Sequence, residues 1–244
     1  MMYLSILAHS LHFKKIDSTQ KYLKKNYKQY PNMMFVSTDF QTMGKGRNTR
    51  TRVSESKANL LFSFLIKDKK LVQKFDVLSV LSAVSIKQAL EEIGLKNVSI
   101  KWPIDVYVNG KKICGILLEG ITKDNKLDAV VIGIGLNVNQ DNFPTDLLRT
   151  PTSIKKEIGE EISVKKVKKI VYKQIVNNFE NIESSNYLSI ARSSNYLKNK
   201  EVYAEINNVK KLVKVLDIND DNSLKVEVDG KIFNIKSGEI TFHL

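Results

Sequence analysis

Short β-type runs joined by tight turns between residues 98 and 139 constrain the fold of this chain most strongly. Residues 98–102 lead into residues 104–108, and then Asn109-Gly110 precedes another run at residues 112–119. Asn-Gly between two β-type runs is the strongest short-range signal for a hairpin. A further turn returns the chain through residues 129–139, which are almost continuously apolar. We therefore predict an antiparallel sheet whose last run is a central strand with both faces covered.

Other stretches predict helices and strands that complete one domain. Residues 71–93 and 163–182 place apolar side chains on one helical face, and Gly94 is a plausible end of the first helix. A shorter helix is expected to begin near residues 16–20, with Asp17 or Ser18 as its N-cap. Residues 33–38 and 59–67 predict two strands, the second buried on both faces. Their lengths and apolarity indicate that the long helices pack on the sheet.

The pattern changes near the C-terminus. Short β-type runs at residues 201–206, 212–218, 224–228 and 231–236 alternate with Asn-, Asp- and Gly-rich turns. They predict a small β-barrel docked on the main domain. We therefore expect an α+β fold: a mixed, largely antiparallel sheet with packed helices in residues 1–196, and the small barrel in residues 197–244.

Composition narrows the possible classes of protein. Cys114 is the single cysteine, which excludes an internal disulfide and a Cys-only metal site and is consistent with a reducing compartment. No apolar run approaches the roughly 20 residues of a membrane span, and the N-terminus lacks signal-peptide features. We expect a cytoplasmic protein. The formal net charge of +13 favours acidic partners, but the lysines are scattered, which weakens the alternative of a dedicated nucleic-acid-binding protein.

Residues 41–52, QTMGKGRNTRTR, are a candidate ligand-binding loop. They hold three of the five arginines, Arg47, Arg50 and Arg52, and two glycines. Arginine presents a planar fork of donors that suits carboxylate and phosphate. An exposed basic loop between two strands is the alternative, and composition leaves both open.

Polar residues interrupt the apolar strands at Lys101, Asp105, Lys112 and Asn137. A lysine beside a core strand needs an anion, and a neighbouring carboxylate could meet it or hold Mg²⁺. Gly133 and Gly135 remove side chains where a ligand could lie against the strand. This Gly-x-Gly is a weak nucleotide signature, because no helix follows it.

Together these stretches resemble biotin protein ligases, and the likeness spans nearly the whole chain. The motifs that carry it are Asp17-Ser18-Thr19, Gln41-Thr42-Met43-Gly44-Lys45-Gly46-Arg47, Lys101-Trp102-Pro103-Ile104-Asp105, Lys111-Lys112-Ile113-Cys114-Gly115-Ile116-Leu117, Gly133-Ile134-Gly135-Leu136-Asn137 and Ser237-Gly238-Glu239-Ile240-Thr241. The resemblance implies a class II synthetase-like catalytic domain and an SH3-like C-terminal barrel. It also implies a short form without the family's N-terminal DNA-binding domain.

The resemblance implies two half-reactions. Biotin and MgATP form biotinoyl-5′-AMP and pyrophosphate, and biotin then passes to a lysine of a biotin carboxyl carrier protein domain of acetyl-CoA carboxylase or a related carboxylase. No specific DNA binding or membrane association is expected, and both a monomer and a homodimer remain open.

The same resemblance implies roles for particular residues. Lys112, with Arg47 and Arg50, is expected to be catalytic. The residues expected to bind biotin are Ser18, Thr19, Gln20, Gln41, Gly44, Lys45, Gly46, Arg47, Lys112, Gly115, Gly133 and Gly135. Those expected to bind ATP are Arg47, Arg50, Lys101, Asp105, Lys112 and Asn137, with Asp105 also a candidate Mg²⁺ ligand.

Three positions depart from the family pattern. Ile104 stands where the family has an asparagine, so one polar contact to nucleotide or metal is lost. Thr49 and Arg52 stand where a glycine and a tryptophan are usual, so the loop is expected to close differently. A lipoate or octanoate protein ligase, which shares the architecture, and an inactive relative are the alternatives within this fold.

Overall fold

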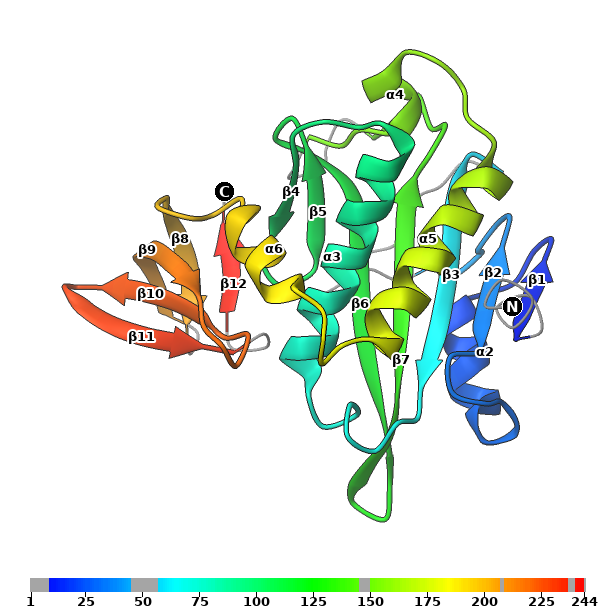
Figure 1. The fold of residues 1–244 in the computed structure, drawn as a ribbon, viewed down its shortest axis with the longest axis horizontal. Coiled ribbons are helices and arrows are strands. Elements are labelled where there is room, and N and C mark those ends of the chain that lie inside the picture. The colour runs from blue at the N-terminus through cyan, green and yellow to red at the C-terminus, as the bar shows by residue number, and fades with distance from the viewer. Residues whose placement is uncertain (1–8, 45–56, 145–149, 207–208, 237–239, 244) are drawn as a thin grey trace.

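A seven-stranded sheet forms the body of the molecule (Figure 1). The computed structural model describes residues 9–44, 57–144, 150–206, 209–236 and 240–243. The strand order is β1-β2-β3-β7-β6-β5-β4, and every neighbouring pair is antiparallel except β1 and β2. The strands are β1 (Ser10–Phe13), β2 (Phe35–Thr38), β3 (Asn59–Ile66), β4 (Val98–Lys101), β5 (Asp105–Val108), β6 (Lys111–Lys123) and β7 (Lys126–Asn137). The sheet is mixed and largely antiparallel, and β7 is its central strand, as predicted.

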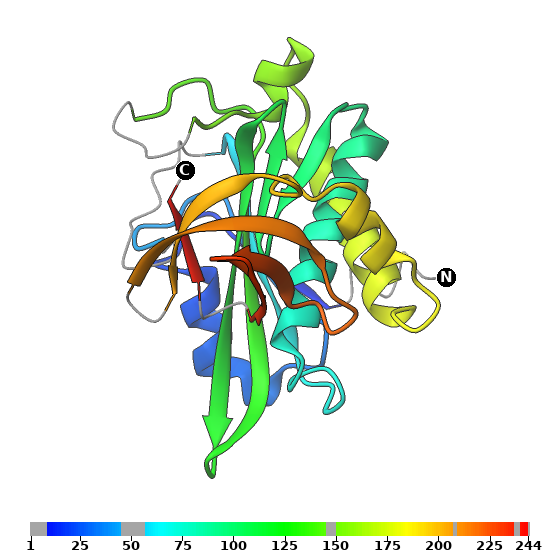
Figure 2. The same ribbon diagram turned by 90° about the vertical axis from the view of Figure 1, so that its left-hand side faces the viewer.

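Helices cover both faces of this sheet. α3 (Phe75–Ile93) and α5 (Val164–Glu180) pack on one face, and the short α2 (Thr19–Asn26) lies on the other (Figures 1 and 2). Alternate residues of β3 and β7 serve the two faces. Phe62 and Ile134 belong to the large core that includes α3 and α5. Leu65 and Val131 belong to a smaller cluster with Leu23 of α2.

Local signals in the sequence explain where most of the helices and strands begin and end. Ser18 caps α2 by accepting a hydrogen bond from the Lys21 amide, and Ser163 caps α5 in the same way. Gly94 ends α3 with φ of 111°, a conformation that glycine adopts without strain. Asn109 and Gly110 both have positive φ, as a two-residue hairpin turn requires. α3 begins at Phe75, four residues after the predicted start.

Several short elements were not predicted with the bounds that they have. They are β1, the 3₁₀ turn η1 (Tyr27–Gln29), α4 (Ile154–Ile158), α6 (Tyr187–Ser193) and β12 (Ile240–His243). Each has eight residues or fewer, which is too short for apolar periodicity to be distinctive. Among the described residues, the helices are too short or too polar to cross a membrane.

A second, smaller sheet lies at one end of the body (Figures 1 and 2). Its five antiparallel strands follow the order β11-β10-β9-β8-β12. The strands that precede β12 are β8 (Glu201–Ile206), β9 (Val209–Ile218), β10 (Leu224–Val228) and β11 (Lys231–Ile235). These are the four predicted runs, within a few residues. The large core continues from the body into this sheet through Val213 and Val215.

Candidate active site

Polar side chains and glycines share the face of the main sheet that carries α2. Strand register places Lys101 opposite Asp105, Asp105 opposite Gly115, and Gly115 opposite Gly135. Residues opposite one another across a sheet point to the same face. Residues from three of the sequence motifs therefore form one row across β4, β5, β6 and β7.

A β-bulge directs Lys112 toward this row. Lys112 and Gly115 are three residues apart, so an unbroken strand would place them on opposite faces. The register between β5 and β6 shifts here, because Val106 lies opposite Cys114 while Tyr107 lies opposite Lys112, which leaves Ile113 as the extra residue. Lys112 therefore points to the same face as Asp105 and Gly115. Bulges often redirect a side chain next to an active site.

Lys112 forms an ion pair with Asp105. Its Nζ lies 2.6 Å from Asp105 Oδ1, and the side chain of Lys112 is one-third exposed. Gly115 makes room for this pair, since a Cβ at that position would lie 3.2 Å from Lys112 Nζ. Lys101, the register partner of Asp105, is buried. The row thus contains two lysines and one aspartate, and lysine ammonium groups can bind an anionic ligand.

The N-terminus of α2 and Gln41 form a neutral polar cluster. The Thr19 amide and hydroxyl both donate to Gln41 Oε1, at 2.9 and 3.2 Å. The Thr19 hydroxyl also lies 2.8 Å from the hydroxyl of Ser63 on β3. Backbone bonds from Thr42 to Ile16 and from Met43 to Asp17 fix this connection. The fold thus brings Thr19 and Gln41, two of the residues expected to bind biotin, into direct contact.

Gln20 lies across β6 and β7 at Gly133. Its Nε2 donates to the carbonyl groups of Leu117 and Val131, at 3.2 and 3.4 Å. A Cβ on Gly133 would lie only 2.2 Å from Gln20 Oε1, so the glycine is required for this arrangement. Gly133 and Gly135 are two residues apart on one face of β7, which corresponds to about 7 Å. The neutral cluster of Thr19, Gln20 and Gln41 and the row that contains Lys101, Asp105 and Lys112, here called the cationic row, therefore lie at the two ends of one candidate site.

Asn137 and the segment at residues 150–152 support the cationic end. The Lys112 amide donates to the Thr150 carbonyl, and the Thr152 amide donates to the Lys112 carbonyl. Asn137 Nδ2 donates to the Thr152 carbonyl at 2.9 Å. No pattern in the sequence indicates a role for the 150–152 segment, because its contribution is made by backbone groups.

The remaining predicted positions fall into two groups. Gly44 is buried beside the Gln41 segment. Lys45, Gly46, Arg47, Thr49, Arg50 and Arg52 lie outside the described residues. Ile104 is buried and belongs to the large apolar core, so its side chain contributes packing. Sequence reasoning missed Ser63, whose only signal was a small polar residue inside a continuous apolar strand.

The described part of the candidate site offers few side chains that could bind a metal ion. Among the described residues, no three His, Cys, Asp or Glu side chains cluster in a way that could hold a metal ion. Mg²⁺ commonly uses one or two carboxylates together with substrate phosphates. Asp105 is one such carboxylate and fits an ion that arrives with a nucleotide.

The fold and the site describe a class of protein: an α+β domain whose sheet carries a neutral polar cluster at one end of a surface and lysine side chains at the other. Residues 12–137 match the model of the Biotin/lipoate A/B protein ligase family. This match covers more than half of the chain, and the chain belongs to that family.

Individual relatives agree with this assignment. The chain is 36% identical over 159 residues to the bifunctional ligase/repressor BirA of Bacillus subtilis, a match that covers 63% of this chain and 48% of that protein. It is 30% identical over 106 residues to the biotin–[acetyl-CoA-carboxylase] ligase of Mycobacterium tuberculosis, covering 42% and 38%. The chain thus spans about half the length of the first curated relatives that it matches.

A solved structure matches nearly the whole chain. It is the biotin protein ligase of Aquifex aeolicus in complex with biotin and ATP, with a TM-score of 0.85 and 29% identity. The match covers 96% of this chain and 98% of that one. It therefore includes the main sheet and the small C-terminal sheet.

Proposed function

We propose that this protein is an ATP-dependent biotin protein ligase. The observation that carries the proposal is the two-ended site on β7. A neutral cluster of Thr19, Gln20 and Gln41 offers donors and acceptors for a ureido ring, and the Lys112 row offers cations for a carboxylate and phosphates. The relatives named as biotin ligases support the choice of biotin.

In the first half-reaction, a biotin carboxylate oxygen attacks the α-phosphorus of ATP. The bond from that phosphorus to the bridging oxygen breaks, pyrophosphate leaves, and biotinoyl-5′-AMP forms. Both reactants are anions, so their approach is unfavourable without a cation between them. Lys112 supplies that cation, since its Nζ lies above Gly115 and is one-third exposed. A positioned charge of this kind also stabilises the charge that develops at phosphorus.

Asp105 holds Lys112 in place before the substrates bind. A carboxylate 2.6 Å from Nζ restricts the flexible lysine side chain and reduces the entropy that must be lost during reaction. Asp105 and the phosphates would hold the Mg²⁺ that accompanies ATP, an ion that neutralises phosphate charge when bound. We propose that Asn137 contacts the nucleotide, and that Lys45, Gly46, Arg47 and Arg50 close over biotin and the phosphates, as the family resemblance implies.

In the second half-reaction, a lysine amine of an acceptor domain attacks the acyl carbon. The bond to the AMP oxygen breaks, AMP leaves, and the amine loses a proton as the amide forms. We propose a biotin carboxyl carrier protein domain as acceptor and the cytoplasm as the location. We also propose that residues 1–196 form the catalytic domain and residues 197–244 a separate C-terminal domain.

The first prediction concerns Lys112 and is tested by ATP–pyrophosphate exchange. Purified protein is assayed with biotin, with lipoate and with no acid. We expect exchange that requires biotin, and we expect Lys112→Ala to reduce kcat by about 10²- to 10³-fold, the usual cost of removing one group that stabilises transition-state charge. Lys111→Ala is the matched control, because Lys111 is adjacent and exposed.

The same assay separates the alternatives. Exchange with lipoate alone would identify a lipoate-type ligase instead. A folded protein that exchanges with neither acid would contradict the proposed activity, and full activity in Lys112→Ala would contradict the role of that lysine.

A further inference from the structure

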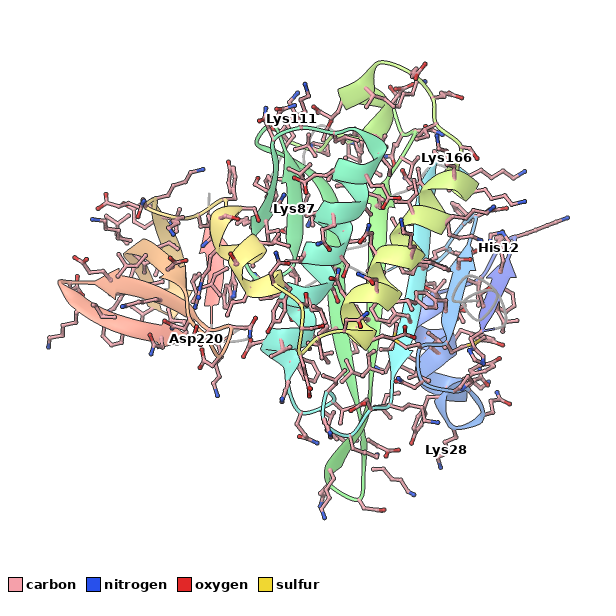
Figure 3. All side chains as sticks on the ribbon, in the orientation of Figure 1. His12, Lys28, Lys87, Lys111, Lys166 and Asp220 are labelled. Atoms are coloured by element: carbon pink, nitrogen blue, oxygen red, sulfur yellow. The ribbon has the colours of Figure 1, made fainter. Side chains whose placement is uncertain are left out.

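The turn between β9 and β10 reaches from the small sheet into the body of the molecule. Asn222, in this turn, is 1% exposed and has φ of 67°. Its backbone carbonyl accepts a hydrogen bond of 3.0 Å from Nε1 of Trp102, which is also 1% exposed. Figure 3 labels the neighbouring Asp220, which marks where the turn lies against the α6 segment.

Trp102 lies within the connection that positions the cationic end of the site. Lys101 is the last residue of β4, Asp105 is the first residue of β5, and Trp102 is one of the three residues between them. Asp105 in turn holds Lys112. A displacement of the indole would therefore be transmitted to the groups expected to meet the phosphates.

Several contacts fix the position of the turn. Asn222 Nδ2 donates to the Tyr187 hydroxyl at 3.1 Å, and the Asn222 amide donates to the Asn219 carbonyl. Arg192 of α6 donates to the Ile218 carbonyl and forms an ion pair with Asp220. The acceptor for Trp102 is thus held by side chains of α6 and by the turn itself.

We propose that Trp102 and Asn222 position the ATP-binding end of the site: the turn at residues 219–223 holds the indole through the bond from Trp102 to the Asn222 carbonyl, and the connection that carries Trp102 fixes Lys101 and Asp105. The proposal rests on the proposed function. A buried indole N–H needs an acceptor, and small displacements of reacting groups lower rates steeply. Trp102 and Asn222 are positioning residues, because they act through Lys101 and Asp105.

Two variants of different chemistry test this role. Trp102→Phe removes the donor but keeps an aromatic ring, and Asn222→Gly tolerates the positive φ but loses the bond to Tyr187. We expect each to raise the KM for ATP in pyrophosphate exchange about fivefold, the effect of one lost hydrogen bond. The KM for biotin should stay within about twofold of wild type, because the biotin end depends on α2 and Gln41.

Asn178→Ala controls for a general loss of stability. Asn178 of α5 donates hydrogen bonds to Ser85 and Gln88 of α3, on the face of the sheet opposite to the candidate site. This control should lower the thermal midpoint without changing either KM. Trp102 is the only tryptophan in the chain, so its emission in Asn222→Gly reports directly on the indole, and we expect a shift to longer wavelength.

The outcomes are distinct. A folded Trp102→Phe protein with an unchanged KM for ATP overturns the proposal, as does equal elevation of the KM values for ATP and biotin. If the wild-type protein shows no exchange, the proposed function fails, and calorimetric ATP affinity then decides the positioning role. Equal affinity of wild type and both variants, or no ATP binding at all, would overturn it.

Discussion

Lys112 points toward the candidate site because of a β-bulge, which the pattern of side chains in the sequence does not predict. The extra residue Ile113 turns Lys112 toward Asp105, and Gly115 leaves the space that its ammonium group occupies. Gly133 likewise leaves the space that the end of the Gln20 side chain occupies, at the other end of the site. These glycines are therefore as necessary for the shape of the candidate site as the polar side chains that lie over them.

Gly133→Ala should weaken biotin binding. The added methyl group would lie only 2.2 Å from Gln20 Oε1, so the end of the Gln20 side chain must move away from Gly133. We expect the affinity for biotin to fall at least about tenfold, equivalent to about 1.4 kcal/mol, with little change in the KM for ATP. Isothermal titration calorimetry measures the former, and pyrophosphate exchange measures the latter.

Gly120→Ala is the matched control on β6. There a Cβ would crowd Leu127 and Phe75, on the side of the sheet that carries α3. It should affect stability without affecting biotin affinity. Unchanged biotin affinity in Gly133→Ala would show that Gln20 has no part in the biotin site.

At the scale of elements, α3 and α5 form the layer that keeps the sheet rigid behind the site. Their contact combines an apolar core with polar links, among which Glu92 of α3 accepts bonds from Gln174 and Lys173 of α5. These bonds, first from Gln174 and then from Lys173, hold the pKa of Glu92 below its usual value of 4.5. The link is therefore strongest when this carboxyl is ionised.

A depressed carboxyl pKa predicts a definite pH dependence. The contribution of Glu92 to the free energy of unfolding is fully present above about pH 4.5, its unfolded pKa, and is lost as the pH falls through the lower folded value. Glu92→Gln should therefore destabilise the protein at pH 7, by less than about 1 kcal/mol for so exposed a pair, and the difference should shrink as the pH falls below about 4.5.

Urea unfolding of both proteins at pH 7 and pH 3 measures this difference. Glu180→Gln is the control, because Glu180 is an exposed acid on α5 for which no ion pair is found among the described residues. A difference between Glu92→Gln and wild type that is constant with pH would contradict the role of the ionised carboxylate.

At the scale of the whole molecule, positive charge surrounds the fold without forming a single stripe. Lys28, Lys111 and Lys166 lie at separate places on the molecule, as labelled in Figure 3. With a net charge of +13, the protein should attract an acidic acceptor domain from a distance, because electrostatic complementarity raises association rates more than it raises affinity.

Transfer of biotin to an acidic carrier domain should therefore depend on ionic strength. We expect kcat/KM for the carrier to fall about tenfold between low and high salt, since salt screens exposed charges. Hydroxylamine, a small neutral acceptor, is the control, because its reaction with the adenylate should change little. Carrier kinetics that are insensitive to salt would exclude steering.

The sequence alone predicted the architecture. Period-2 runs, the Asn-Gly turn and apolar helical faces are local signals, and local signals predict the sheet, its central strand and the long helices. Lys112 and Gly133 are candidate site residues because a polar residue or a glycine interrupts an apolar strand there, and the loop that begins at Gln41 is a candidate because it holds three arginines and two glycines. The roles of these residues stay predictions.

How these pieces meet depends on the tertiary structure. The bulge at Ile113, the contact of Thr19 with Ser63 and the bond from Trp102 to Asn222 join residues separated by up to 120 positions. The bulge depends on strand register, and the indole of Trp102 meets a backbone carbonyl, a group that every residue possesses. Thr19 and Ser63 meet through hydroxyl groups, which many residues of the chain carry. A local sequence pattern cannot mark such contacts, because only the folded chain brings the partners together.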